Sequence, residues 1–164
     1  MAIHFHTNPQ RATTQAENTM STSTSKVAIV TGASRGIGRE VAKRLAQDGF
    51  AVVVNYVSSA ADADTLVAAI QAQGGQALAV KANVASAQDV RRLFDETEHH
   101  FGGVDVLINN AGIMTLSTIA DSDDESVDRQ IDINFKGTFN TLREAAKRMR
   151  DGGRVVNFSS SVVA

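Results

Sequence analysis

The stretch "KVAIVTGASRGIG" (26–38) decides the fold, because it joins a buried strand to a helix through a turn rich in glycine. "KVAIV" (26–30) is a short apolar run with β-branched residues, typical of a strand covered on both faces. "TGASRGIG" (31–38) follows, and from Ile37 apolar residues recur at helical spacing until Gly49. A strand, a glycine turn and a helix in this order predict the first βαβ unit of a parallel sheet.

Apolar runs and helical periodicity alternate along the rest of the chain. Four further runs predict strands, at 51–56, 77–84, 104–110 and 154–159. The segments between them have apolar residues at helical spacing, and the last of these predicts one long helix over 122–150. Strands that alternate with helices of this length imply right-handed crossovers and a parallel sheet. We therefore expect an α/β fold with a helix layer on each face.

Two of the expected helices begin with a capping signature, in which a serine is followed three residues later by an acidic residue. These pairs are Ser86 with Asp89, and Ser122 with Glu125. The signatures predict that the two helices start directly after Ser86 and Ser122.

Composition narrows the function classes. The 164 residues carry 16 basic and 18 acidic side chains, and a formal charge of −2 gives no basic field for nucleic acid or a membrane. The absence of cysteine excludes disulfides, thiolate catalysis and cysteine metal sites. Apolar stretches such as "FAVVV" (50–54) are too short to cross a bilayer. We expect a cytoplasmic protein with no nucleic-acid or membrane partner and no bound metal.

Residues 1–25 differ from the rest, because they are polar, rich in serine and threonine, and without periodicity. They show no secretory pattern, since no apolar segment follows a basic start. His4 and His6 fit a disordered tail better than a metal site. We therefore divide the chain into a disordered polar tail at 1–25 and one domain at 26–164.

The glycines of the turn, Gly32, Gly36 and Gly38, suit the binding of a phosphate group. Free N–H groups and the helix dipole at the start of a helix favour an anion. Glycines also let the backbone approach a pyrophosphate with no Cβ between them. A purely structural turn is the alternative, but the position of these glycines in the first βαβ unit favours a dinucleotide site.

Four ordered motifs resemble the short-chain dehydrogenase/reductase family. The turn has the spacing TGxxxGxG, and "NNAG" (109–112) follows at about the separation found in the classical type of the family. "DINFKGTF" (132–139) is similar to the segment that carries the family's catalytic Asn, and "GRVVNFSS" (153–160) to the strand that ends in its catalytic Ser. The resemblance spans 26–164 and points to the 3-oxoacyl carrier-protein reductase and sugar or polyol dehydrogenase group. It implies a Rossmann-type doubly wound sheet, here with about five strands in the order 3-2-1-4-5 and without the C-terminal part of the family fold.

The resemblance implies a nicotinamide dinucleotide, and the end of the second strand selects its type. An acidic residue there usually holds the free ribose 2′-OH of NAD. This chain has Asn55 at that place, which would not repel a 2′-phosphate, and Arg35 in the turn supplies a cation. Ser58 and Ser59 would add hydroxyl donors. We therefore predict NADP(H), the alternative for Arg35 being a solvated loop residue.

Further cofactor contacts follow from the resemblance. Asn83 and Val84 replace the family's Asp-hydrophobic pair beside the adenine, and an Asn still accepts a hydrogen bond from an exocyclic amine. In "NNAG", Asn109 is expected to tie neighbouring strands, whereas Asn110 is expected to contact the cofactor. The full set of expected cofactor residues is Gly32, Ser34, Arg35, Gly36, Ile37, Gly38, Asn55, Asn83, Val84, Asn110, Ala111 and Gly112.

The resemblance also implies hydride transfer between the nicotinamide and a carbonyl or alcohol carbon, with a Tyr–Lys pair for the proton. Asn134 would anchor a water of the proton relay, the alternative being a polar helix residue that faces a neighbouring loop. Ser160 would hold the substrate oxygen, with Ser161 as the alternative register. The Tyr and Lys should follow as YxxxK about a dozen residues later, one helical turn apart. The sequence ends at Ala164, and its only tyrosine, Tyr56, is expected at the adenosine end.

Together these features predict the cofactor-binding half of an NADP-dependent short-chain oxidoreductase, with weak or no turnover of its own. A non-catalytic NADP(H)-binding module and an inactive remnant are the alternatives. The completed enzyme would act on a small carbonyl or alcohol. Helix 122–150 would pair with its counterpart in a partner subunit, or the missing half would complete the fold. Otherwise apolar surface stays bare at Val155, Val156, Phe158, Val162 and Val163.

Overall fold

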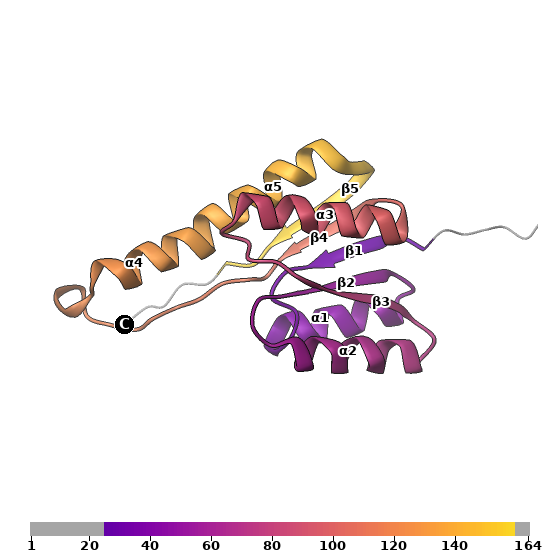
Figure 1. Cartoon of the computed structure of the whole chain (residues 1–164), viewed down its shortest axis with the longest axis horizontal. Coiled ribbons are helices and arrows are strands. Elements are labelled where there is room, and N and C mark those ends of the chain that lie inside the picture. Colours follow the sequence, from indigo (N-terminus) through magenta and orange to yellow (C-terminus); the bar gives the residue numbers. More distant parts are fainter. Residues whose placement is uncertain (1–24, 160–164) are drawn as a thin grey trace, which may run out of the picture.

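The computed structural model describes residues 25–159, which contain one five-stranded parallel sheet. Its strands lie in the order β3-β2-β1-β4-β5, which confirms the predicted order and the Rossmann-type α/β class (Figure 1). Most of the expected tail (1–24) and Val162 and Val163 lie outside the described residues. The strands are β1 (Val27–Val30), β2 (Ala51–Tyr56), β3 (Gln76–Lys81), β4 (Val104–Asn109) and β5 (Met149–Asn157).

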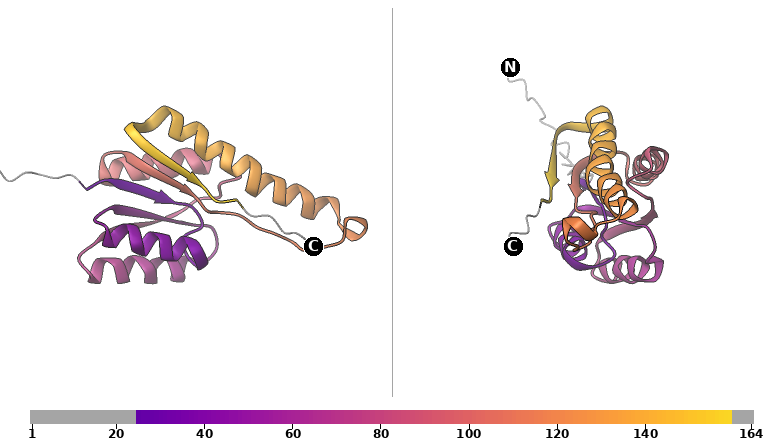
Figure 2. Two further views of the ribbon diagram at one scale, coloured as in Figure 1. Left: turned by 180° about the vertical axis from the view of Figure 1, so that it is seen from behind. Right: turned by 90° about the vertical axis from the view of Figure 1, so that its left-hand side faces the viewer.

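Helices cover both faces of the sheet, as the views from two sides show (Figures 1 and 2). One layer contains α1 and α2, and the other contains α3 and α5. Between β4 and α5 the chain forms a short 3₁₀ helix, a short α-helix and a π-helical turn, and α4 extends away from the sheet. The bounds are α1 (Gly36–Gln47), α2 (Ala60–Ala72), α3 (Ala87–Phe101), η1 (Ile119–Asp121), α4 (Asp124–Gln130), η2 (Ile131–Lys136) and α5 (Gly137–Arg148).

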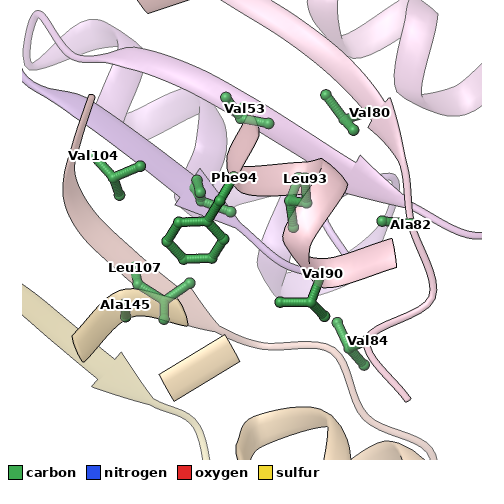
Figure 3. Packing of buried hydrophobic residues seen from close by; sticks show 11 residues of the cluster. Val53, Val80, Ala82, Val84, Val90, Leu93, Phe94, Val104, Leu107 and Ala145 are labelled. Atoms are coloured by element: carbon green, nitrogen blue, oxygen red, sulfur yellow. The ribbon is translucent and has the colours of Figure 1, made fainter. Parts of the chain in front are cut away.

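Side chains of the central strands alternate between the two faces and divide the core into two clusters. In β2, Val53 belongs to the cluster on the α3 side, whereas Val52 and Val54 belong to the cluster with α1 and α2. Phe94 of α3 is fully buried in the first cluster, near Leu107 of β4 (Figure 3). The central strands β1, β2 and β4 therefore have cores on both sides.

The segment between β3 and α3 confirms one predicted cap and shortens the predicted strand. Ser86 Oγ accepts a hydrogen bond from the N–H of Asp89 at 3.2 Å, as the capping signature requires. The Asp89 carboxylate accepts the N–H of Asn83 at 2.9 Å instead of returning to Ser86. Because the backbone turns at Asn83 to reach this carboxylate, β3 ends at Lys81 and not at residue 84.

The predicted long helix 122–150 is helical without a break from Asp124 to Arg148, with a π-helical turn inside it (Figure 1). It begins at Asp124, because the carboxylate of Asp123 accepts the N–H of Ser126 at 2.7 Å and so caps the helix in place of Ser122. The Ser122 hydroxyl donates to the carbonyl of Thr118 at 2.9 Å. The π-helical turn η2 lies between α4 and α5. Turns of this kind are frequent at functional sites.

β5 begins earlier than predicted, at Met149, and is irregular. Its pairing with β4 shifts between Val104 and Val106, whose partners are Met149 and Arg154. The extra residues contain Gly152 with φ of +79°, a conformation that suits glycine. Residues 150–153, which precede the predicted strand, therefore form an irregularity within β5.

Apolar side chains are exposed along β5 and along the segment from α4 to α5. Val155 and Val156 are 39% and 46% exposed, and consecutive strand residues point to opposite faces, so β5 is uncovered on both faces. Phe158 is also exposed, which confirms the bare surface expected at these three residues. We call the exposed apolar face the set Val127, Ile131, Phe135 and Phe139, which recur every four residues along the helical segment from α4 to α5.

An ion-pair network joins α3 and α5, the two helices on the same face of the sheet. The guanidinium of Arg148 in α5 contacts the carboxylates of Asp95 and Glu98 in α3 at 2.6 and 2.7 Å, and Glu144 lies 3.7 Å away. The hydrogen bond to Glu98 is the main reason that the pKa of Arg148 is raised, while partial burial opposes the increase.

No helix within residues 25–159 is both long and apolar enough to cross a membrane.

Candidate functional site

A cavity of about 1010 Å³ lies at the carboxyl ends of the strands, where the glycine turn meets the ends of β2 and β4. Open α/β sheets bind ligands at this edge. A smaller cavity of about 420 Å³ lies between the C-terminal ends of α1 and α2, away from all the predicted site residues. The expected cofactor residues that border the large cavity are Gly32, Ser34, Arg35, Gly36, Ile37, Asn55, Asn83, Val84, Asn110, Ala111 and Gly112.

Two positions of the turn require glycine because other parts of the backbone lie very close to them. Gly32 has φ of +63°, and a Cβ there would lie 2.9 Å from the Cα of Ala111. Gly38 does not border the cavity, but a Cβ there would lie 2.7 Å from the carbonyl oxygen of Gly32 and would collide with the amide of Asn110. The turn can therefore pack against the "NNAG" segment only with glycine at these places.

The N-terminus of α1 is open to an anion. Its N-cap residue, Arg35, makes no side-chain cap, whereas α3 and α4 are capped by Ser86 and Asp123. Within the described part of the chain, the N–H groups of Gly36 and Ile37 have no acceptor. Unpaired N–H donors at the positive end of a helix dipole, beside an exposed arginine, form a site for phosphate.

Asn55 occupies a different place from the one expected. Its side chain is only 1% exposed, and its Oδ1 accepts the N–H of Gly32 at 3.1 Å. Its Nδ2 donates to the carbonyls of Ala82 at 2.9 Å and Val80 at 3.3 Å. Because these partners lie inside the protein, the amide supports the glycine turn and does not project toward a ribose phosphate.

Tyr56, which was expected at the adenosine end, lies at this place. It follows Asn55, is half-buried and borders the cavity together with Ser58 and Ser59. Side chains alternate along a strand, so Tyr56 lies on the opposite face of the sheet from Asn55, where it packs against the cluster with α1 and α2. The alternation in "VVVNY" (52–56) was the available signal, but the sequence alone does not show which face each of the two residues takes.

Asn110 and a residue not predicted, Thr31, join β4 to the turn. The Nδ2 of Asn110 donates to the carbonyls of Thr31 at 2.9 Å and Gly32 at 3.2 Å. The buried Thr31 hydroxyl oxygen accepts the N–H groups of Asn110 and Ala111, both at 3.0 Å. The Asn110 side chain therefore fixes the turn from the side opposite Asn55, and the backbone at Ala111 and Gly112 is left beside the cavity.

The segment expected near the adenine, residues 83–85, is held in place by two side-chain amides. Asn83 is exposed, and its Oδ1 accepts the N–H of Ala85 at 3.0 Å. Val84 is buried in the α3 cluster. The buried Asn140 of α5, which was not predicted, donates to the carbonyls of Val84 at 3.0 Å and Ala85 at 3.3 Å.

Asn134 lies in the π-helical turn and holds the segment after "NNAG". Its Oδ1 accepts the N–H of Ile113 at 2.9 Å, and its Nδ2 donates to the carbonyl of Ile113 at 2.7 Å. Asn109, as expected, ties neighbouring strands, because its Nδ2 donates to the Oδ1 of Asn157 at 2.8 Å. Asn134 thus meets a neighbouring loop, which was the alternative interpretation of this residue.

The remaining catalytic predictions fall at the end of β5. Because β5 runs parallel to β4, its carboxyl end at Asn157 lies at the same sheet edge as Asn109 and the cavity. Ser160 and its alternative Ser161 lie outside the described residues.

Charge is unevenly distributed around the cavity. Arg35 stands at the glycine-turn end, whereas Glu125, Asp128 and Asp132 stand at the end formed by α4 and η2, with Arg129 among them. Phosphate groups are therefore favoured at the turn and disfavoured at the far wall.

A protein-family model for short chain dehydrogenases matches residues 26–163. The chain belongs to the short-chain dehydrogenase family. An uncharacterized oxidoreductase of Methylorubrum extorquens is 47% identical over 137 residues, which cover 84% of this chain and 55% of that protein. A 3-oxoacyl-[acyl-carrier-protein] reductase of Staphylococcus aureus is 43% identical over 141 residues, 85% of this chain and 57% of its own.

Solved structures of short-chain dehydrogenases show the same arrangement of strands and helices. A short chain dehydrogenase from Burkholderia cenocepacia, in complex with NADP, superposes with a TM-score of 0.78 at 40% identity. The match covers 80% of this chain and 54% of that one. The chain therefore spans about half the length of the short-chain dehydrogenases that it matches.

Proposed function

We propose that this chain is the cofactor-binding half of an NADP(H)-dependent short-chain oxidoreductase. The observation that carries the proposal is the uncapped N-terminus of α1, which opens with its glycine turn into the large cavity. The pyrophosphate of a dinucleotide would accept the free N–H groups of Gly36 and Ile37. The adenosine would extend toward Asn83 and Val84, and the nicotinamide toward Gly112 and Asn134.

NADP(H) is favoured over NAD(H) by the charges at the end of β2. Tyr56 borders the cavity at the end of β2, where an NAD site usually has a carboxylate for the ribose 2′-OH, and the buried Asn55 beside it is uncharged. Arg35 is exposed beside the same part of the cavity, where its guanidinium would pair with a 2′-phosphate. Ser58 and Ser59 would add hydroxyl donors. The Burkholderia cenocepacia relative, which was solved with NADP, supports this choice.

The reaction proposed for the complete protein is hydride transfer between the nicotinamide and the carbonyl or alcohol carbon of a small substrate. Ser160 would hold the substrate oxygen, and Asn134 would order the backbone at Ile113 beside it. The 164 residues contain a single tyrosine, Tyr56, which lies at the end of β2 away from Asn134. We therefore expect a polypeptide of this sequence to show no more than trace turnover, and NADPH oxidation with a ketone at ordinary enzyme rates would contradict this.

A non-catalytic NADP(H)-binding module is the second candidate. It is favoured by the cofactor side of the site, because the glycine turn, the open helix and the selecting residues all border one cavity within residues 25–159. Turnover with a carbonyl substrate separates the two candidates, whereas cofactor binding is common to both.

A fluorescence titration of the 164-residue chain with NADPH and with NADH tests the cofactor. We expect NADPH to bind at least about tenfold more tightly, and Arg35→Ala to remove most of that preference by weakening NADPH alone. Arg44→Ala is the matched control, because Arg44 lies on the same helix but pairs with Asp48 at its far end. Failure to bind either cofactor would refute the proposed function, and equal affinities would refute the choice of NADP(H).

A further inference from the structure

The entry to the glycine turn is held at two successive peptides by one residue. The N–H of Gly32 donates to the side-chain Oδ1 of Asn55 at 3.1 Å, and the N–H of Ala33 donates to the main-chain carbonyl of Asn55 at 2.8 Å. The carbonyl of Gly32 is held from the opposite side by the Nδ2 of Asn110, at 3.2 Å. The Gly32 peptide is thus fixed at both its donor and its acceptor.

The other end of the Asn55 amide ties the turn to β3. Its Nδ2 donates to the carbonyl of Ala82, directly after that strand, at 2.9 Å and to the carbonyl of Val80, near its end, at 3.3 Å. The side chain is 1% exposed, so water does not replace these partners. One carboxamide therefore links the glycine turn after β1, the end of β2 and the end of β3.

We propose that Asn55 is a positioning residue of the cofactor site, which acts through the glycine turn and does not touch the cofactor. By fixing the peptides of Gly32 and Ala33, it sets the direction of the N–H groups that follow at the start of α1. The proposal rests on the proposed function, because those N–H groups are the ones assigned to the cofactor pyrophosphate. Donors that are fixed before binding cost less ordering free energy when the ligand arrives.

An amide is the required chemistry at this position. Asn55→Leu has a similar volume but leaves the Gly32 N–H without its acceptor and removes the side-chain donor to the Val80 and Ala82 carbonyls. Asn55→Asp keeps the acceptor for Gly32, but its second oxygen faces the carbonyls of Val80 and Ala82 and places a negative charge beneath the anion site. Burial raises the pKa of such a carboxyl group. When protonated, the carboxyl again donates to one carbonyl and resembles the native amide.

The test is the affinity of the full chain for NADP⁺ as a function of pH, measured by calorimetry for wild type, Asn55→Asp and Asn55→Leu. Each result is expressed as the ratio of variant to wild-type Kd at the same pH, which cancels the titration of the cofactor phosphate. We expect the Asn55→Asp ratio to be about 30 near pH 8.5 and to fall to about 3 near pH 5.5. The Asn55→Leu ratio should stay above about 10 throughout, because leucine does not titrate.

Asn109→Asp is the matched control. Asn109 is also a buried asparagine at a strand end, but it ties β4 to β5 and does not border the cavity. Its ratio should remain within about threefold of unity at every pH. An Asn55→Leu chain that is folded by circular dichroism and binds like wild type would overturn the proposal. An Asn55→Asp ratio independent of pH, or the same pH dependence in Asn109→Asp, would also overturn it.

Hydrogen exchange measured by NMR on the unliganded wild-type chain decides the question if the variants do not fold. Slow exchange is expected at the Gly32 N–H and at the Asn55 carboxamide, because both are buried in the contacts described. Fast exchange at both groups would overturn the proposal. This readout does not depend on NADP⁺, so failure of the wild type to bind cofactor would count against the proposed function and not against the placement of Asn55.

Discussion

The two halves of the sheet differ in how completely they are covered. Every residue of β1 is buried and β2 is buried up to Asn55, whereas Val155 and Val156 of β5 are exposed on opposite faces. The cofactor side thus has a core on both faces from residues 25–159 alone. The side formed by α4, η2 and β5 carries the exposed apolar face, which a partner subunit or further parts of the fold would cover. Cofactor binding should therefore depend on this chain's own packing, and substrate chemistry on additional surface.

The largest effect is expected from Phe94→Ala. Phe94 is fully buried between α3 and the central strands, so its truncation should lower the free energy of unfolding by about 3–5 kcal/mol. Urea unfolding followed by circular dichroism measures the change, and a loss of the cooperative transition fits the same expectation. A decrease in the free energy of unfolding of less than about 1 kcal/mol would show that Phe94 is not packed in the core as described.

Gly38→Ala tests the approach of the turn to "NNAG". The added Cβ would lie 2.7 Å from the Gly32 carbonyl oxygen, so NADPH affinity should fall by about 100-fold, although alanine favours a helix. Gly74→Ala is the control, because Gly74 has φ of +82° but no atom within 4 Å of an added Cβ, and it lies away from the cavity. That control should lose stability and keep its affinity. Equal affinities for Gly38→Ala and wild type would contradict the geometry.

Asn134→Ala probes the less covered half. Removal of both hydrogen bonds to Ile113 should cost about 1–2 kcal/mol locally and accelerate amide exchange after "NNAG". NADPH affinity should change by less than about fivefold, since the glycine turn is held by other residues. Exchange NMR and titration on the same sample measure both quantities. If Asn134→Ala reduced NADPH affinity as much as Gly38→Ala does, the two halves of the sheet would not differ in their contribution to cofactor binding.

Phe135→Ser should have the smallest effect on folding. Its side chain is 74% exposed, so the free energy of unfolding should change by less than about 0.5 kcal/mol. If the exposed apolar face binds a second copy of the chain, the variant should self-associate less than wild type in sedimentation experiments. Phe94 provides the contrast, since the same residue type is there fully buried. A strong loss of stability in Phe135→Ser would show that this face is covered within the chain.

Most of the fold was accessible to prediction because its signals are local. Apolar runs bounded by turns located all five strands, and the glycine spacing located the first βαβ unit. The errors arose where two local signals competed. Asp123 displaced Ser122 as the cap of α4, and β5 begins at Met149, before the predicted strand, with an irregularity at Gly152.

The candidate site was only partly accessible for the same reason. Motifs placed Arg35, Asn110 and Gly112 at one cavity. They did not reveal the roles of Thr31 and Asn140. Thr31 and Asn140 contact residues more than 50 positions away in the chain. The spacing of nearby residues does not indicate such long-range pairs.

The sequence by itself determined the parallel α/β architecture and the open glycine turn, because periodicity and left-handed glycine conformations depend on neighbouring residues in the chain. The tertiary structure alone decided what the buried amides do. Asn55 could have pointed to solvent or inward, since a strand offers both directions. Its partners at Gly32, Val80 and Ala82 come together only when three strands lie side by side, and a buried amide must bind whatever groups it meets there.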